Sequence, residues 1–132
     1  MDIIALIGSS NVGKTLTLNI LYSLLIADGY VQVFGHFADH ANNDFMDILE
    51  KNGLLIGIAT QGDYSRELPK YLTYLNTNGC VKTICACTNS KVGTLNAINV
   101  YSNTKVNKTI DTIYRTQRIT NTIDAVNLKT LI

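Results

Sequence analysis

Apolar runs along the chain alternate with segments whose apolar residues recur at helical spacing. The first run, residues 3–7, is continuously apolar, which is typical of a strand that is buried on both faces of a sheet. Residues 15–28 carry leucine and isoleucine on most faces, which predicts a largely buried helix that ends at Gly29. The chain therefore begins with a strand, a glycine-rich turn and a helix.

The middle of the chain contains a segment whose pattern fits two structures. Residues 44–51 have the spacing of an amphipathic helix, but Asn52-Gly53 follows, the dipeptide that a type I′ hairpin turn favours. A second strand-like run, residues 54–60, comes directly after it. We therefore predict a β-hairpin here rather than a helix.

The remainder of the chain predicts further helices and strands in alternation. In order, we expect a helix at 65–78, a strand at 80–87, a helix at 94–101, a strand at 109–114 and a helix at 121–132. Asn121 and Asp124 have the spacing of a capping pair at the start of the last helix.

This alternation predicts an α/β fold for the whole chain. We expect a three-layer α/β/α sandwich with a mainly parallel five-stranded sheet and one antiparallel edge strand. A length of 132 residues argues for a single domain over residues 1–132, and an apolar fraction of 46% is enough to form a core.

The turn after the first strand carries the strongest functional signal. Gly8-Ser9-Ser10-Asn11-Val12-Gly13-Lys14-Thr15 matches the pattern G-x-x-x-x-G-K-[ST] at every position. Glycines let the backbone curl until its N–H groups converge on phosphate oxygens, and the following helix adds its positive dipole end. The lysine supplies a cation for the outer phosphates, and the threonine hydroxyl can ligate Mg²⁺.

The motif resembles the Walker A loop of the P-loop NTPase superfamily. The resemblance is close over the first 30 residues and extends to the rest only in the order of strands and helices. It implies that ATP or GTP binds with Mg²⁺ to Gly8, Ser9, Ser10, Asn11, Val12, Gly13, Lys14 and Thr15. It also implies that Lys14 assists hydrolysis or phosphoryl transfer.

Such enzymes need an acid near the end of a neighbouring strand to hold Mg²⁺ through water. Asp63 is the candidate, three positions past Thr60, and we assign it a metal-binding and catalytic role. Its alternative role is that of an ordinary acid at the start of the next helix. Gln61 could position a water molecule or be an exposed loop residue.

The order of elements also resembles that of the small GTPases, but two of their motifs are missing. The switch Asp-x-x-Gly and the guanine reader Asn-Lys-x-Asp correspond here to residues 60–63 and 88–91, and neither matches. No acid is present to grip a guanine edge. We therefore expect ATP rather than GTP.

Several basic side chains could face a phosphate. Arg66 follows Asp63, Lys91 follows the predicted strand at 80–87, and Arg115 and Arg118 lie near the end of the predicted strand at 109–114. Residues 105–118 carry four basic residues against one acid. They could form a lid over phosphates or a weak nucleic-acid patch, but a solvated surface is the commoner explanation. A zinc site or a catalytic Asp39 in the cluster His36, Asp39 and His40 is likewise weaker than a polar loop.

Charge and cysteine content narrow the classes of partner. The net charge of +1 gives no global argument for nucleic acid or an anionic membrane. The longest apolar stretch, residues 16–27, is too short and too polar to span a membrane. Cys80, Cys85 and Cys87 do not form a disulfide framework, so we expect buried thiols in a reduced, cytoplasmic protein.

Two functions fit these features. The first is a small ATP-binding kinase or nucleoside-triphosphatase with Mg²⁺ as cofactor. The second is an interaction module with little turnover, in which bound nucleotide orders residues 39–43 and gates a protein partner. A nucleic-acid accessory protein that uses residues 105–118 is a weaker third.

Overall fold

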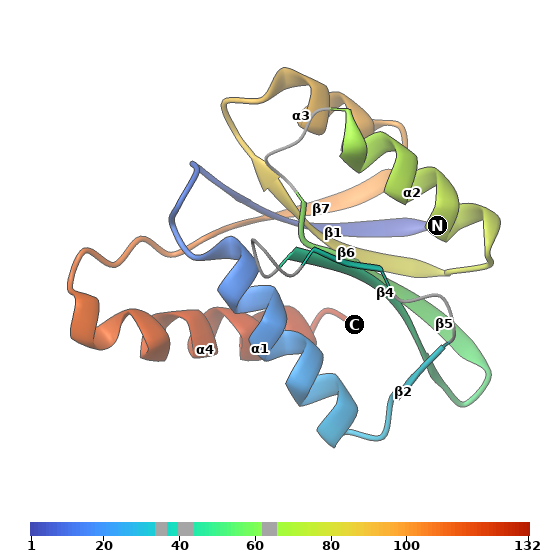
Figure 1. Ribbon diagram of the computed structural model, residues 1–132, viewed down its shortest axis with the longest axis horizontal. Coiled ribbons are helices and arrows are strands. Elements are labelled where there is room, and N and C mark those ends of the chain that lie inside the picture. Colours follow the sequence, from blue (N-terminus) through green and yellow to red (C-terminus); the bar gives the residue numbers. More distant parts are fainter. Residues whose placement is uncertain (34–36, 40–43, 62–65) are drawn as a thin grey trace.

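The apolar run near the N-terminus forms β1 (Asp2–Gly8) in the middle of a sheet (Figure 1). The computed structural model describes residues 1–33, 37–39, 44–61 and 66–132. Successive side chains of a strand point to opposite faces, so Ile3, Ala5 and Ile7 join one core, whereas Ile4 and Leu6 join the other. Both faces of β1 are therefore buried, as its sequence predicts.

Among the described residues, seven strands form the sheet, two more than the five that we expected. The others are β2 (Val31–Gln32), β3 (Phe37–Asp39), β4 (Asp44–Lys51), β5 (Leu54–Ala59), β6 (Lys82–Thr88) and β7 (Ser102–Asn107). Their order is β2-β4-β5-β6-β1-β7, with β3 also paired to β4. Neighbours from β5 to β7 are parallel, whereas β4 is antiparallel to β2, β3 and β5. The sheet is thus mixed, with an antiparallel region in place of one antiparallel edge strand.

Helices cover both faces of the sheet. They are α1 (Lys14–Ala27), α2 (Glu67–Thr77), α3 (Val92–Asn99) and α4 (Gln117–Lys129), with a 3₁₀ turn at Tyr114–Thr116. One core contains leucines of α1 and α4, and the other contains apolar residues of α2 and α3. Figure 1 shows α1 and α4 on one side of the sheet and α2 and α3 on the other, which gives three layers.

The predicted hairpin is confirmed. Residues 44–51 form β4 and pair with β5 in antiparallel register. Asn52 and Gly53 both have positive φ, 54° and 79°, as a type I′ turn requires. The turn dipeptide therefore distinguished strand from helix correctly.

The last third of the chain differs from its prediction. Residues 109–114 are not a strand, because the edge position next to β1 is taken by the polar segment β7. Since an edge strand is half exposed, its sequence lacks the apolar run that marked the other strands. The final helix begins at Gln117, so Asn121 and Asp124 are buried inside α4 and are not a capping pair.

Candidate functional site

Residues 8–15 form the connection between β1 and α1, which we call the 8–15 loop. Asn11 and Gly13 have φ of 63° and 94°, in the left-handed region that glycine and asparagine tolerate best. A Cβ atom on Gly8 would lie 2.9 Å from Cγ2 of Val12, and one on Gly13 would lie 2.8 Å from Oδ1 of Asn121. The backbone conformation at Gly13 therefore favours glycine, and a side chain at Gly8 would force Val12 to shift.

Lys14 folds back along this loop. Its side chain is buried, and its Nζ atom donates hydrogen bonds to the carbonyl oxygens of Gly8 (3.1 Å) and Ser9 (2.6 Å). These contacts hold the cation against the backbone turn. A lysine in this position can attract an anion that enters the loop.

The loop also leads into the N-terminal end of α1. Gly13 is the N-cap residue and supplies no side-chain cap. The first N–H groups of a helix have no acceptor within it, and together with the helix dipole they favour an anion. This end of the helix faces a cleft of about 750 Å³, which residues 11–16 line on one side.

The cleft lies where the carboxyl ends of the parallel strands meet, which is the usual binding edge of such sheets. Figure 1 shows the 8–15 loop and the segment after β7 at this edge. The remaining lining residues are Asp44, Thr60, Lys108, Thr109, Ile110, Asp111, Thr112, Gln117 and Asn121.

Asp44 supplies the cleft with an acid that the sequence analysis missed. Its Oδ1 atom accepts hydrogen bonds from the hydroxyl groups of Thr15 and Thr60, each at 3.0 Å, and the residue is buried. The threonine of the motif and a carboxylate from the hairpin thus share one polar contact. Carboxylate and hydroxyl oxygens are the kind of donor that Mg²⁺ prefers, so this pair fits the ion.

Asp44 escaped detection because β4 runs antiparallel to its neighbours. Parallel strands bring acids to the binding edge only after their last residues. An antiparallel strand instead begins at that edge, so Asp44, the first residue of β4, lies there. The predicted hairpin already contained the clue, because the first residue of its first strand lies at the same edge as the last residue of its second strand.

Two further contacts tie β4 to α1 near Asp44. The Tyr22 hydroxyl donates to Oδ2 of Asp47 (2.9 Å), and the rings of Tyr22 and Phe45 meet edge to face at 5.3 Å. Burial, together with the Asp47 carboxylate, raises the pKa of Tyr22 to about 12. The tyrosine therefore stays neutral and keeps donating, which fixes the start of β4 against the helix.

The opposite wall of the cleft contains a buried ion pair. Nζ of Lys108 lies 2.8 Å from Oδ2 of Asp124, and the two side chains are almost fully buried. Burial by itself would raise the pKa of Asp124, but hydrogen bonds from Lys108 and Thr109 outweigh it and hold this pKa below its usual value. Lys108 also donates to the carbonyl oxygen of Thr109 (2.8 Å), so its charge is satisfied within the wall.

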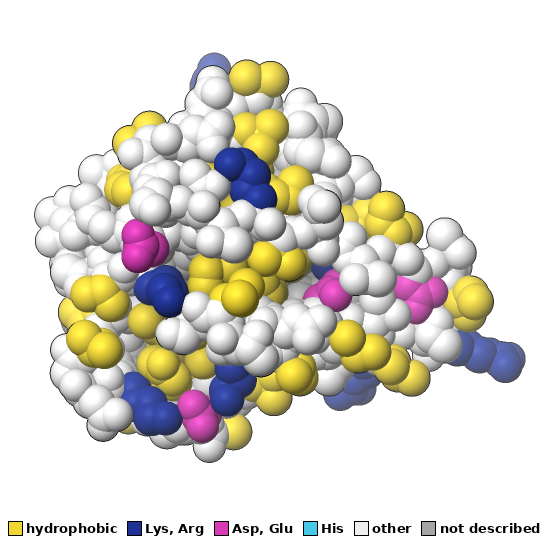
Figure 2. Space-filling model, turned by 180° about the vertical axis from the view of Figure 1, so that it is seen from behind, with side chains coloured by type: hydrophobic (Ala, Val, Ile, Leu, Met, Phe, Trp, Pro, Cys, Tyr) yellow, Lys and Arg dark blue, Asp and Glu magenta, His cyan; other side chains and the backbone are white. Residues whose placement is uncertain are grey.

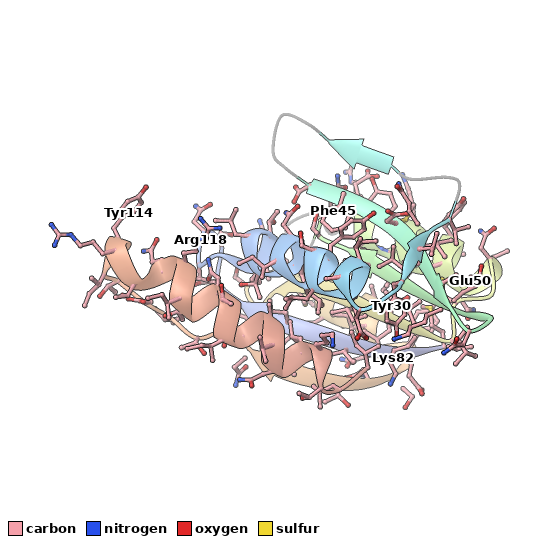
Figure 3. All side chains as sticks on the ribbon, turned by 90° about the horizontal axis from the view of Figure 1, so that it is seen from below. Tyr30, Phe45, Glu50, Lys82, Tyr114 and Arg118 are labelled. Carbon is pink, nitrogen blue, oxygen red and sulfur yellow. The ribbon has the colours of Figure 1, made fainter. Side chains whose placement is uncertain are left out.

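Only some of the predicted site residues line the cleft. Residues 11–15 of the motif do so, including Lys14 and Thr15, whereas Asp63 lies outside the described residues. Gln61 is buried rather than exposed. The four candidate cations are all exposed, and none lines the cleft: Arg66, Lys91, Arg115 and Arg118. Figure 3 shows Tyr114 and Arg118 at the projecting end of α4.

The candidate metal cluster of His36, Asp39 and His40 falls almost wholly outside the part of the chain that the structure describes. His36 and His40 lie outside the described residues, as does the side chain of Asp39, and residues elsewhere form no group of three metal-binding side chains. Cys80, Cys85 and Cys87 are free and buried, and burial raises the pKa of all three thiols. The prediction of buried thiols is confirmed.

The surface gives no sign of an extended basic patch on the face shown in Figure 2, where Lys and Arg side chains of the described residues are scattered singly. Within the described ranges, no helix has the length and apolar character needed to cross a membrane. The chain matches no protein-family model, no curated protein and no solved structure.

Proposed function

We propose that this chain binds a nucleoside triphosphate with Mg²⁺ in the cleft, through a fold of the P-loop NTPase type. The observation that carries the proposal is the meeting of three features at one edge of the sheet. A complete G-x-x-x-x-G-K-[ST] motif forms the turn between a buried strand and a helix, its lysine folds over the turn, and its threonine touches a buried carboxylate.

The residues have distinct roles in this proposal. Backbone N–H groups of the 8–15 loop and the first turn of α1 hold the phosphates, and Lys14 neutralises charge on the outer ones. Thr15 and Asp44 hold Mg²⁺, with Asp63 as the further acid that the sequence suggests. The ion would stabilise the charge on the phosphate oxygens.

The same chemistry supports two outcomes for the bound nucleotide. A kinase or nucleoside-triphosphatase would transfer the outer phosphoryl group to an acceptor or to water. A regulated interaction module would retain the nucleotide and use it to gate a partner. The exposed apolar residues on α4, Ile119 (60%), Ile123 (55%) and Val126 (47%), recur at helical spacing and favour the second outcome.

The first experiment is calorimetric titration of ATP and GTP, each with Mg²⁺, into the wild-type protein and Lys14→Ala. We expect ATP to bind the wild type and to lose most of its affinity in the variant, because the cation that faces the outer phosphates is gone. Lys70→Ala, an exposed lysine on α2, is the matched control. If neither nucleotide binds the wild type, the proposal is wrong.

The rate at which the bound nucleotide is hydrolysed or transferred then distinguishes an enzyme from an interaction module. Release of inorganic phosphate at a steady rate, or transfer to an added acceptor, supports an enzyme. Tight retention of nucleotide with very slow release of phosphate supports the interaction module.

A further inference from the structure

The cleft has two ends, and the order of the strands determines what each contains. β1, which carries the 8–15 loop, lies between β7 on one side and β6, β5 and β4 on the other. Asp44 and Thr60 line the end toward β4, whereas residues 108–112, Gln117 and Asn121 line the end toward β7. If Thr15 and Asp44 hold the metal and the outer phosphates, the rest of the nucleotide extends toward the second end.

Asn121 stands out at this second end. The residue is only 6% exposed, and its amide packs against Gly13 of the loop. Its amide has no hydrogen-bond partner among the described residues. Every fully buried side-chain nitrogen or oxygen in those residues does have a partner, so the Asn121 amide must keep a small exposed surface. The remaining exposure of the amide is therefore toward the cleft that it lines. A buried amide with unused donor and acceptor groups is costly unless a ligand or water satisfies it.

The charged side chains of this wall already have partners within the chain. Lys108 is held by Asp124, and the Asp111 carboxylate accepts hydrogen bonds from the hydroxyls of Thr116 and Thr120, each at 2.7 Å. The neutral groups on this wall include the Asn121 amide, the Thr112 hydroxyl and the side-chain oxygen of Gln117, whose Nε2 donates to the Asp111 carbonyl (3.0 Å).

Apolar surface accompanies these amides. Ile110 and Leu16 both line the cleft and are 70% and 55% exposed. They come from the two walls, Leu16 from α1 and Ile110 from the segment after β7. Neutral amides beside exposed apolar side chains suit a flat heteroaromatic ring better than an anion.

We propose that this end of the cleft binds the base of the nucleotide, and that the Asn121 amide reads an adenine edge. The inference rests on the proposed function of the same cleft. One amide matches adenine, whose N6 amino group donates and whose N7 accepts. The corresponding guanine edge offers two acceptors, N7 and O6, which leaves the amide oxygen opposite an acceptor.

The test compares ATP, GTP and inorganic tripolyphosphate, each with Mg²⁺, as ligands of the wild type and of Asn121→Ala. Tripolyphosphate has the phosphates without the base. We expect Asn121→Ala to weaken ATP binding about tenfold, the loss of one or two hydrogen bonds, and to leave tripolyphosphate binding unchanged. Asn127→Ala, the same residue type on the exposed side of α4, is the matched control.

A second variant keeps the size of the side chain. Asn121→Asp carries only acceptors at neutral pH, so it should weaken ATP binding and shift the preference toward guanine, whose N1 and N2 groups donate. Circular dichroism and the midpoint of urea unfolding establish that each variant folds.

Each remaining outcome identifies which proposal is wrong. An equal loss of ATP and tripolyphosphate affinity in Asn121→Ala would mean that Asn121 only supports Gly13, and base reading would be rejected. Unchanged ATP binding in both Asn121 variants would also reject it, while the nucleotide site itself would stand. A wild type that binds neither ATP nor tripolyphosphate would overturn the nucleotide site and the base reading together.

Discussion

Single residues of the cleft come from parts of the chain that are far apart. Thr15 belongs to the glycine-rich motif and Asp44 to the hairpin, yet the hydroxyl of one donates to the carboxylate of the other at 3.0 Å. The motif could be recognised from the sequence because its residues are consecutive and each has a known chemical purpose. Asp44 was missed, because no spacing rule connects it to Thr15 and the antiparallel direction of β4 is what brings it to the cleft.

Asp44→Asn tests the metal role at this scale. We expect the dissociation constant for ATP to rise about tenfold or more in the presence of Mg²⁺, because the carboxylate is lost, and to stay unchanged in EDTA. Isothermal titration of both conditions measures the difference. Glu50→Gln, at the exposed end of the same strand, is the control. Equal weakening with and without Mg²⁺ would contradict a metal-binding role.

At the scale of elements, a sequence pattern predicted the correct helix or strand where a specific conformational requirement lay behind it. The hairpin could be predicted because only residues that tolerate positive φ fit a type I′ turn, and both turn residues have it. The edge strand β7 was missed because an exposed strand needs no apolar run. The start of α4 was misplaced because buried polar residues inside the helix were taken for a cap.

The hairpin turn allows a stability test. Gly53 has φ of 79°, and an added Cβ would meet no atom within 4 Å, so a side chain there costs backbone strain without a clash. Gly53→Ala should lower the free energy of unfolding by about 1 kcal/mol, and Gly53→Asn by less, because asparagine adopts this conformation more readily. Urea unfolding monitored by circular dichroism measures both. Equal costs for alanine and asparagine would argue against strain as the cause.

At the scale of the whole molecule, the Lys108–Asp124 pair joins the end of β7 to α4 and so closes one wall of the cleft. Lys108 was predicted as part of a basic surface, but the structure buries it. Removing one partner of a buried pair leaves the other charge without compensation, which is strongly destabilising.

Asp124→Asn should therefore lower the free energy of unfolding at pH 7 by about 3 kcal/mol. Because folding lowers the pKa of Asp124, its contribution is complete above the ordinary carboxyl pKa of about 4 and is lost as the pH falls through the lower, folded value. The gap between wild type and variant should be constant near neutrality and shrink in acid. Urea unfolding at a series of pH values follows it.

Asp28→Asn, which removes partly exposed ion pairs to Lys51 and Lys129, is the matched control and should have a much smaller effect at pH 7. A gap between wild type and Asp124→Asn that widens as the pH falls would contradict the assignment.

The sequence by itself determined the α/β alternation, the 8–15 loop between a strand and a helix, and the hairpin. These depend on periodicity and on the conformations of glycine and asparagine, which act over a few residues. Only the tertiary structure decided that Asp44 meets Thr15, that Asn121 packs on Gly13 and that Lys108 pairs with Asp124. Each of these contacts joins elements whose order in the sheet is not encoded in local pattern, because strand order and direction are set by the packing of the whole chain.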